Sequence, residues 1–340
     1  MDENIESLND IARISMKYQD LYNIIIELTN YCNWRCKYCF VEKQELNKLS
    51  KDKVCAVLKE LKESGAYHVT FTGGEIFTYE ECIEVIVFAR KLGFEVEILS
   101  NASLINEELV KKLADIHIEK FSCSIFSMNE DIHDKFVESK NSLQKVKHNL
   151  SLLKLYNIPV EVKVGVTNYN KYEWNQIEEY CKENGFNFIV DCTIRPSNEG
   201  DNSTVDYALS KDELTELINI LDKKQDITKF DNCDENFICS DSRCSLTIKA
   251  NGDVCPCVNW PYIVGNIYES SIVEIWNSKK FKKIRSLTWR DTIKCHECNI
   301  KEYCQRCPGI AMLQNNNILE KAPINCTMAE ARKIARVNYD

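Results

Sequence analysis

Short apolar runs alternate with longer amphipathic stretches through the first 195 residues of the chain. Short runs rich in Ile, Val and Phe are typical of strands, and apolar positions repeated every three or four residues are typical of helices. Six strands are predicted, at 22–28, 67–73, 94–100, 119–125, 160–167 and 186–192. Helices are predicted between them, at 50–64, 78–92, 106–116, 130–156 and 171–184.

This alternation predicts a parallel sheet whose faces are covered by helices. Each strand–helix unit takes roughly 30 residues, and a closed barrel of eight units needs roughly 250. The roughly 175 residues from 21 to 195 have room for six units. The sequence therefore predicts an α/β fold with an open, partial (β/α)6 barrel of the TIM-like kind.

The pattern changes after residue 195. PSNEGDNST has the composition of a linker, and the region beyond it is rich in cysteine. A hairpin is predicted at 245–257, turning at Asn251-Gly252, and helices are predicted at 210–224, 271–287 and 327–337. The expected divisions are an N-terminal extension (1–20), a barrel core (21–195), a linker with a bridging helix (196–232) and a cysteine-rich domain (233–340).

Charge and hydropathy exclude several classes of partner. The formal net charge is −9, which argues against a broad surface for nucleic acid. The chain has no apolar run of the roughly 18 residues that a transmembrane helix needs. Its N-terminus, MDENIESLND, lacks the basic and apolar regions of a signal peptide. We therefore expect a cytoplasmic protein that binds neither nucleic acid nor membrane.

The 18 cysteines are the outstanding feature of the composition. In a chain without an export signal, clustered cysteines more often bind metal than form disulfides. Cys32, Cys36 and Cys39 have the spacing C-x3-C-x2-C directly after the first strand, at the end of a barrel where reactive groups gather. Three thiolates can bind three irons of a [4Fe–4S] cube and leave the fourth iron open. A structural zinc site would need a fourth Cys or His, and no His lies near this loop in the sequence.

The segment CNWRCKYC resembles the signature of the radical S-adenosylmethionine (SAM) superfamily, with Tyr38 as its aromatic residue. This resemblance implies that SAM chelates the open iron through its amino and carboxylate groups. It also implies that an electron from the cluster cleaves SAM to methionine and a 5′-deoxyadenosyl radical, which abstracts a hydrogen atom from the substrate. The cofactor carries that chemistry, and the protein binds and orients it.

Further positions resemble the SAM-contacting residues of the family. The triplet Gly73-Gly74-Glu75 follows the second strand and resembles the motif that contacts the methionine amino group. Asn101 follows the third strand and Ser124 ends the fourth, where relatives often contact SAM. Glycines at a strand end allow a ligand to approach the backbone closely.

Two departures from the family pattern affect this site. The usual Pro-Leu after the triplet is replaced by Ile76-Phe77. Many relatives have an Arg shortly after a His-Asp pair, but Val137 stands about there in this chain, after His133-Asp134. The SAM carboxylate is therefore expected to be held differently.

The C-terminal cysteines resemble the SPASM extension of the superfamily, which holds two auxiliary [4Fe–4S] clusters. Their order is Cys239-x4-Cys244-x12-Cys257, then Cys295-x2-Cys298-x5-Cys304-x2-Cys307, then Cys326. The resemblance implies an interleaved assignment, with Cys239, Cys244, Cys257 and Cys307 on the first auxiliary cluster and Cys295, Cys298, Cys304 and Cys326 on the second. The family commonly has x3 before the last clustered cysteine, and Cys233 and Cys255 lie close enough in sequence to replace a ligand. Paired C-x2-C motifs also leave zinc open as an alternative.

Members with the SPASM extension mostly modify peptides. The resemblance therefore implies an oxidoreductase that forms a thioether or another oxidative crosslink in a ribosomally made precursor peptide. One alternative is a peptide epimerase in which Cys233 or Cys255 donates hydrogen. A second is dehydrogenation as in sulfatase maturases, although Val258 replaces the Asp that follows the equivalent of Cys257 in those enzymes. A third, from another class, is an electron-transfer or scaffold protein that never cleaves SAM.

The resemblance also implies partners and an environment. A flavodoxin- or ferredoxin-type donor would reduce the first cluster, and exposed clusters favour an anaerobic setting. Only about 20 residues precede the first strand, so a winged leader-binding module is not expected there and a separate leader-binding protein is an option. His133, Tyr169 and Arg195 are further candidates for the pocket.

Overall fold

The computed structural model describes residues 8–41, 46–224 and 229–337. Within these ranges, one nine-stranded sheet has the order β6-β5-β4-β3-β2-β1-β7-β8-β9. The strands are β1 (Asn23–Thr29), β2 (His68–Gly73), β3 (Glu95–Leu99), β4 (Lys120–Ser124), β5 (Val160–Gly165), β6 (Asn187–Asp191), β7 (Ser245–Ile248), β8 (Asp253–Cys255) and β9 (Gly265–Asn266). None of the described helices combines the length and apolar character needed to cross a bilayer.

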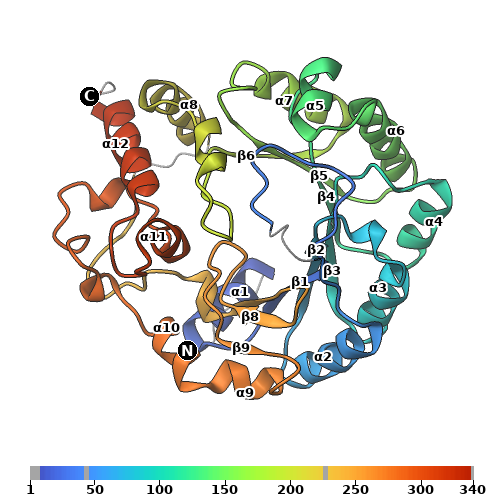
Figure 1. The fold of residues 1–340 in the computed structure, drawn as a ribbon, viewed down its shortest axis with the longest axis horizontal. Helices are drawn as coiled ribbons and strands as arrows, with labels where there is room; N and C mark the ends of the chain where they lie inside the picture. The colour runs from blue at the N-terminus through green and yellow to red at the C-terminus, as the bar shows by residue number, and fades with distance from the viewer. Residues whose placement is uncertain (1–7, 42–45, 225–228, 338–340) are drawn as a thin grey trace.

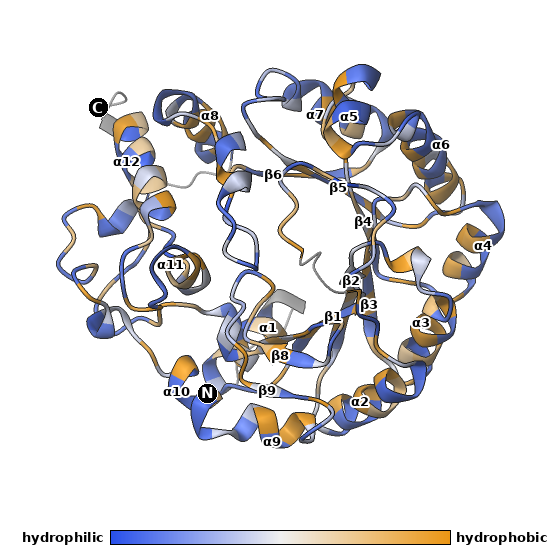
Figure 2. Cartoon of the chain, viewed as in Figure 1, coloured by the Kyte–Doolittle hydropathy of each residue, from blue (hydrophilic) through white to orange (hydrophobic). Residues whose placement is uncertain are grey.

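The first six strands pair in parallel with their sequence neighbours, and the helices that follow them lie outside the curved sheet (Figure 1). These helices are α2 (Lys51–Glu63), α3 (Cys82–Lys91), α4 (Glu107–Asp115), α5 (Glu130–Val137), α6 (Ser142–Leu155) and α7 (Trp174–Asn184). These helices follow β1 to β5, with α5 and α6 both after β4. The predicted partial barrel of six parallel strands is therefore confirmed. Figure 2 shows that the outer helices carry apolar residues on one side and polar residues on the other.

The helix predicted at 130–156 is two helices, α5 and α6. Glu138 and Asn141 between them adopt left-handed backbone conformations, with φ of 55° and 56°, which ends α5. The Asp134 carboxylate accepts hydrogen bonds from the backbone of Asn141 and from Ser142 N, the latter at 2.8 Å. The apolar periodicity of the sequence continues across this break, so periodicity alone predicts a single helix.

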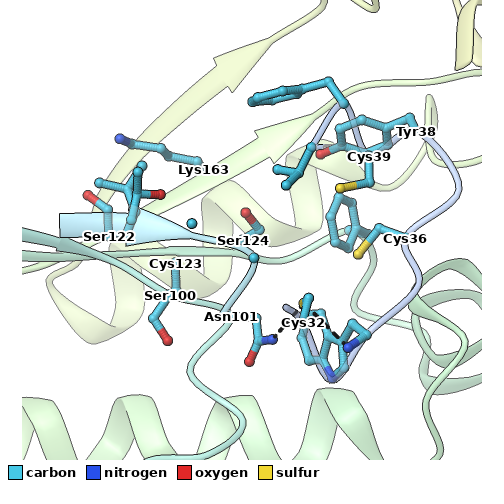
Figure 3. Close-up of a pocket in the computed structure, with 18 residues that line it drawn as sticks. Cys32, Cys36, Tyr38, Cys39, Ser100, Asn101, Ser122, Cys123, Ser124 and Lys163 are labelled. Atoms are coloured by element: carbon cyan, nitrogen blue, oxygen red, sulfur yellow. Dashed lines mark hydrogen bonds between the residues drawn. The ribbon is translucent and has the colours of Figure 1, made fainter. Parts of the chain in front are cut away.

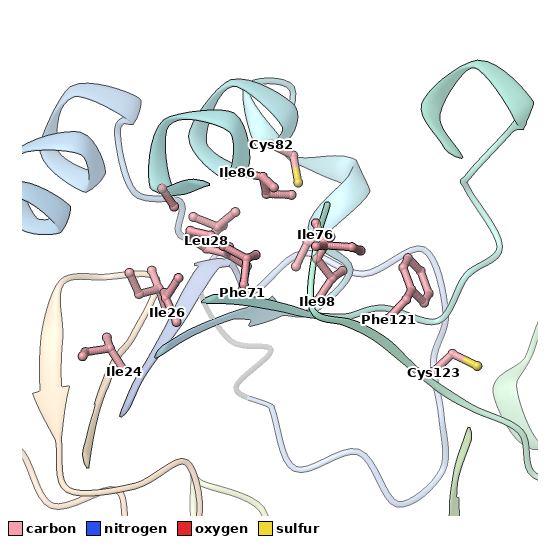
Figure 4. Packing of buried hydrophobic residues seen from close by; sticks show 14 of the residues in the cluster. Ile24, Ile26, Leu28, Phe71, Ile76, Cys82, Ile86, Ile98, Phe121 and Cys123 are labelled. Atoms are coloured by element: carbon pink, nitrogen blue, oxygen red, sulfur yellow. The ribbon is translucent and has the colours of Figure 1, made fainter. Parts of the chain in front are cut away.

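The two faces of the barrel strands differ in polarity. Alternate residues point to opposite sides of a strand, and Ile24, Ile26 and Leu28 pack outward with other apolar side chains near α3 (Figure 4). On the other face, Ser122 Oγ donates to Glu97 and Glu161 at 2.8 and 3.1 Å. The interior of the barrel is therefore polar and is not filled by the apolar layers of a closed barrel.

The C-terminal region extends the barrel sheet. The predicted hairpin is confirmed, because β7 pairs antiparallel with β8 and Gly252 in the turn has φ of 89°. The same β7 also pairs in parallel with β1, and apolar residues of both regions belong to one core cluster. The sequence did not predict this pairing, because local patterns carry no information on the register of distant strands.

Six further α-helices in the described ranges complete the fold. They are α1 (Leu8–Tyr18), α8 (Lys211–Lys224), α9 (Ile272–Asn277), α10 (Lys279–Arg285), α11 (Pro308–Asn315) and α12 (Pro323–Val337). The helix predicted at 271–287 is divided where Ser278 takes an extended conformation and caps α10. α1 lies in the expected N-terminal extension, and Arg243 donates to the carbonyls of Met16 and Lys17 in its last turn, at 2.9 and 3.2 Å.

Candidate active site

The first predicted site lies at the end of β1. Cys32, Cys36 and Cys39 line one cavity of about 230 Å³, and their thiols lie opposite Ser100, Asn101 and Ser124 (Figure 3). The remaining lining includes Tyr38, Gly73, Gly74 and Lys163. Every predicted SAM-contacting residue except Glu75 therefore lines the cavity that contains the three thiols.

The cysteine loop is held by the end of α5. Arg35 N donates to the Val137 carbonyl at 3.0 Å, and Lys37 N donates to the Phe136 carbonyl at 3.2 Å. The Tyr38 ring lies 5.3 Å from the Phe136 ring, and burial raises the pKa of its hydroxyl well above the usual value. At Val137, where many relatives have an Arg, the backbone thus positions the cysteine loop.

The glycines of the triplet are required by close backbone contact. A Cβ on Gly73 would lie 2.1 Å from the Thr29 carbonyl oxygen, and one on Gly74 would lie 2.2 Å from that of Tyr31. The backbone amides of Gly74 and Glu75 donate to these two carbonyls, each at 2.8 Å. The triplet therefore fixes the start of the cysteine loop, and its glycines also border the cavity.

Glu75 acts behind the cavity wall. It is completely buried, and its carboxylate accepts hydrogen bonds from Ser100 Oγ at 2.8 Å and from Asn101 N at 2.7 Å. Burial raises its pKa, and hydrogen bonds from Phe77, Asn101 and Ser100 oppose that effect. Glu75 thus joins β2 to the end of β3 and positions Asn101, whose side-chain nitrogen lies 3.9 Å from Cys32 Sγ.

A second cavity, of about 530 Å³, adjoins the first and shares Tyr38, Phe40, Ser124 and Lys163 with it. Its far wall comes from the C-terminal region and includes Asn259, Gln305, Cys307, Ile310 and Asn325. Asp191 is the acidic residue among the described lining residues of this cavity. Sequence reasoning missed Asp191 and Lys163, although their positions in β6 and β5 could have suggested them.

Four C-terminal thiols form one electrostatic group. Burial raises the pKa of Cys257 to about 12, and the nearby thiols of Cys239 and Cys307 act in the same direction. Burial likewise raises the pKa of Cys244 to about 12, with a further contribution from Cys239. These are the four cysteines that the resemblance assigns to the first auxiliary cluster, and that assignment stays a prediction.

The other four form a second group. Burial raises the pKa of Cys304 to about 12, and Cys326, Cys295 and Cys298 add to the effect. Burial raises the pKa of Cys326 too, again with contributions from Cys295 and Cys298. Cys304 and Cys307 are close in sequence, yet each has its thiol neighbours in a different group.

The donor chemistry of these groups fits iron–sulfur clusters. Within the described ranges, no three Cys, His, Asp or Glu side chains converge on a point as the donors of a single metal ion do. A zinc site has its thiolates about 2.3 Å from one centre, whereas each thiolate of a cubane cluster binds its own iron. Both C-terminal groups consist of four thiols, which is the ligand set of a [4Fe–4S] cluster.

Of the remaining candidates, Arg195 lines the second cavity, and the other four lie away from both cavities. Cys233 is exposed and Cys255 is completely buried in β8, and neither lines either cavity. His133 is also completely buried, bonded to Ser142 Oγ at 2.8 Å, and burial lowers its pKa to about 4. Tyr169 packs against Tyr207 with the ring centroids 5.7 Å apart.

Family models match both halves of the chain. The model of the radical SAM superfamily matches residues 26–183, and the SPASM model, an iron–sulfur cluster-binding domain, matches residues 239–308. The chain therefore belongs to the radical SAM superfamily and carries a SPASM domain. These domains imply an enzyme that uses S-adenosylmethionine and [4Fe–4S] clusters.

The named relatives are distant and differ in their reactions. The AdoMet-dependent heme synthase of Methanosarcina barkeri is 23% identical over 328 residues, covering 87% of this chain and 94% of that protein. The subtilosin biosynthesis protein AlbA of Bacillus subtilis is 25% identical over 303 residues, covering 83% and 66% respectively. The cysteine-type anaerobic sulfatase-maturating enzyme of Clostridium novyi is 25% identical over 334 residues, covering 84% and 87%.

A solved structure has the same fold across nearly the whole chain. SuiB of Streptococcus suis, bound to its precursor peptide SuiA, superimposes with a TM-score of 0.71. The match covers 96% of this chain and 83% of SuiB, at 17% identity. At this identity the likeness establishes the shared fold alone.

Proposed function

We propose that this enzyme matures a ribosomally made precursor peptide by forming a thioether or another oxidative crosslink. The main support is the cavity of about 530 Å³ that leads from the predicted SAM site to Cys307. A substrate in this cavity would contact both the SAM site and the first group of auxiliary thiols. AlbA is named as a bacteriocin biosynthesis protein and SuiB is bound to a precursor peptide, and both names point the same way.

In this proposal Cys32, Cys36 and Cys39 hold the SAM cluster, and the eight C-terminal thiols hold two auxiliary clusters. When bound, SAM and its cluster supply the radical, and the auxiliary clusters supply an electron acceptor. Gly73, Gly74, Asn101 and Ser124, which line the first cavity, would border the bound SAM. Tyr38 and Phe40 separate the two cavities while contributing to both.

Asp191 is our candidate for the proton acceptor. A thioether joins a carbon that has lost a hydrogen atom to a thiol that has lost a proton, and one electron must also leave the peptide. The radical takes the hydrogen atom, so a base is needed for the thiol proton. The Asp191 carboxylate lies in the cavity wall. Its Oδ1 accepts a hydrogen bond from the backbone N–H of Thr193 at 2.8 Å.

The two enzymatic alternatives use the same radical and differ in the fate of the substrate after the hydrogen atom has been removed. Epimerisation has less support, because Cys233 and Cys255 lie away from both cavities. Dehydrogenation like that of the sulfatase-maturating relative would need the same base and electron acceptor, and Asp191 could serve there too. An electron-transfer or scaffold role would leave the SAM cavity beside the three thiols without a purpose.

Peptides encoded beside the gene provide the test. We would incubate anaerobically reconstituted enzyme, SAM and dithionite with each synthetic peptide, with the Cys36→Ala variant as control. A peptide that loses two hydrogens and gains a link resistant to thiol reduction supports the proposal. Loss of two hydrogens without a link supports dehydrogenation, and deuterium at an α-carbon in heavy water supports epimerisation. Processing of a tetrapyrrole and of no peptide would contradict the proposal.

The same proposal leads us to expect a particular physiological setting. We expect a flavodoxin or ferredoxin to replace dithionite, in an anaerobic cytoplasm. A separate leader-binding protein should increase peptide turnover if the leader is not recognised by this chain. Adding such a protein encoded nearby to the peptide assay tests that point.

A further inference from the structure

Arg195 is a buried cation between the two predicted cluster regions. It follows β6 and is only 5% exposed. Its guanidinium stacks on the ring of Phe40, with the Cζ atom 4.0 Å from the ring centroid, and Phe40 directly follows Cys39. Arg195 also lines the second cavity together with Cys307.

The hydrogen bonds of Arg195 tie its own segment to residues 258–259 without neutralising its charge. Nε donates to Asn259 Oδ1 at 2.9 Å, and Nη2 donates to the Val258 carbonyl at 3.1 Å. Nη1 donates to Asn198 Oδ1 and the Pro196 carbonyl, at 3.0 and 3.1 Å. All four acceptors are neutral, so the charge of the side chain is hydrogen-bonded but not balanced by these partners.

A buried charge is costly unless an opposite charge lies near it. The ionisable groups that act most strongly on Arg195 are the thiols of Cys307 and Cys257, followed by Glu27 and Cys39. As free thiols the two leading groups are neutral, but as cluster ligands they would be thiolates. A cluster on Cys257 and Cys307 would therefore place negative charge where it acts on Arg195 more strongly than the Glu27 carboxylate does.

We propose that Arg195 is a positioning residue that acts as the internal counter-ion of the first auxiliary cluster and raises its reduction potential. A cluster becomes more negative when it is reduced, so a fixed buried cation stabilises the reduced state more than the oxidised state. The auxiliary cluster beside the substrate cavity would then accept an electron more readily, as an oxidative reaction requires. This inference rests on the cluster assignment within the proposed function, but it does not depend on the identity of the peptide.

The test compares Arg195→Met, which removes the charge, with Arg195→Lys, which keeps it. Both variants are reconstituted anaerobically, their iron is counted, and the auxiliary clusters are titrated with reductant while their EPR signals are followed. The EPR signal of the SAM-binding cluster on Cys32, Cys36 and Cys39 is identified by its change when SAM is added, which separates it from the auxiliary signals. We expect a more negative midpoint potential for the first auxiliary cluster in Arg195→Met, and a potential close to that of the unmodified enzyme in Arg195→Lys.

Arg285→Met is the matched control. Arg285 is equally buried, at 3% exposure, and also stacks on an aromatic ring, that of Trp276. Its ionisable neighbour is Arg243, with no thiol involved. This control should leave the potential of the first auxiliary cluster unchanged.

An unchanged potential in Arg195→Met with full iron would overturn the proposal. Loss of about four irons in Arg195→Met but not in Arg195→Lys would support it, because the charge would then be needed for the cluster to bind. Equal loss in both variants would overturn it in favour of a purely geometric role. Absence of auxiliary signals in the unmodified enzyme would contradict the cluster assignment, whereas failure to find a peptide would leave this measurement unaffected.

Discussion

The barrel and the cysteine-rich region of this enzyme are organised in different ways. In the barrel, regular strands and covering helices form a core, and the site residues project from the ends of β1 to β6. In the C-terminal region, β7, β8 and β9 have only four, three and two residues, and two groups of four thiols lie among loops. The barrel has longer paired strands covered by helices, whereas the second region combines these short strands with a separate small core between α8 and α12.

This difference suggests what each region requires. Metal binding contributes directly to folding free energy where a site does not form in the unfolded chain. We therefore expect the barrel to keep its SAM cavity without auxiliary clusters, and the C-terminal region to depend on them. Substitutions in the two regions should therefore differ in their effect on one quantity, the rate at which 5′-deoxyadenosine forms in the absence of substrate.

Among substitutions that keep Cys32, Cys36 and Cys39, the largest effect on this rate is expected from Gly74→Ala. The new Cβ would lie 2.2 Å from the Tyr31 carbonyl oxygen, so the start of the cysteine loop must move. Overpacking of this kind costs about 1–3 kcal/mol, and each 1.36 kcal/mol corresponds to about tenfold in rate. We expect a decrease of about tenfold to hundredfold, measured by chromatography of the nucleoside.

Gly309→Ala provides the matched clash in the other region, since its Cβ would lie 1.9 Å from the Asn259 carbonyl oxygen. Iron content and auxiliary signals should fall in this variant while nucleoside formation stays close to that of the unmodified enzyme. Equal loss of nucleoside in both glycine variants would show that the two regions are not separable.

A smaller effect, about tenfold, is expected from Glu75→Gln. The substitution preserves shape but removes the charge that accepts hydrogen bonds from Ser100 and Asn101. Because Gln keeps one acceptor oxygen, the loss should lie at the lower end of the about 1.5–3 kcal/mol that a hydrogen bond to a charged group contributes. SAM binding, measured by equilibrium dialysis, should weaken while the iron content is unchanged. Glu119→Gln is the control, because Glu119 pairs with His68 near the start of the parallel strands, and it should leave both quantities unchanged.

Paired cysteine substitutions should have the smallest effect on nucleoside formation and a large effect on iron. Cys257→Ala with Cys307→Ala removes two ligands of one predicted cluster, so about four of about 12 irons should be lost. Cys304→Ala with Cys307→Ala removes one ligand from each, so about eight should be lost. Iron is measured by a colorimetric assay after anaerobic reconstitution, and the reverse order of the two losses would contradict the interleaved assignment.

The sequence predicted the barrel well because each strand–helix unit carries its own periodic signal. It also predicted the β7–β8 hairpin from Asn251-Gly252, a local turn signal. It did not predict that β7 would pair with β1, or that α5 and α6 are separate, because these features depend on distant contacts and on single backbone conformations. Asp191, which faces the second cavity, was missed for a similar reason, since the far wall of that cavity comes from the C-terminal region.

For the site, spacing and family motifs indicated segments that meet at one cavity, but not what each side chain contacts. Gly73 and Gly74 were predicted to make room for a ligand, and they also make room for the backbone of Thr29 and Tyr31. Glu75 was predicted beside SAM, but its carboxylate accepts hydrogen bonds from Ser100 and Asn101, directly after β3. Such roles depend on which backbone groups meet after folding, and the spacing of residues does not record that.

The most direct test of the account is anaerobic incubation of the reconstituted enzyme with dithionite and SAM, assayed for 5′-deoxyadenosine beside the Cys36→Ala variant. Our account predicts the nucleoside from the intact protein, which should hold about 12 irons, and none from the variant, which should hold about eight. No nucleoside from an intact protein with full iron and bound SAM, with or without the candidate peptides, would contradict it.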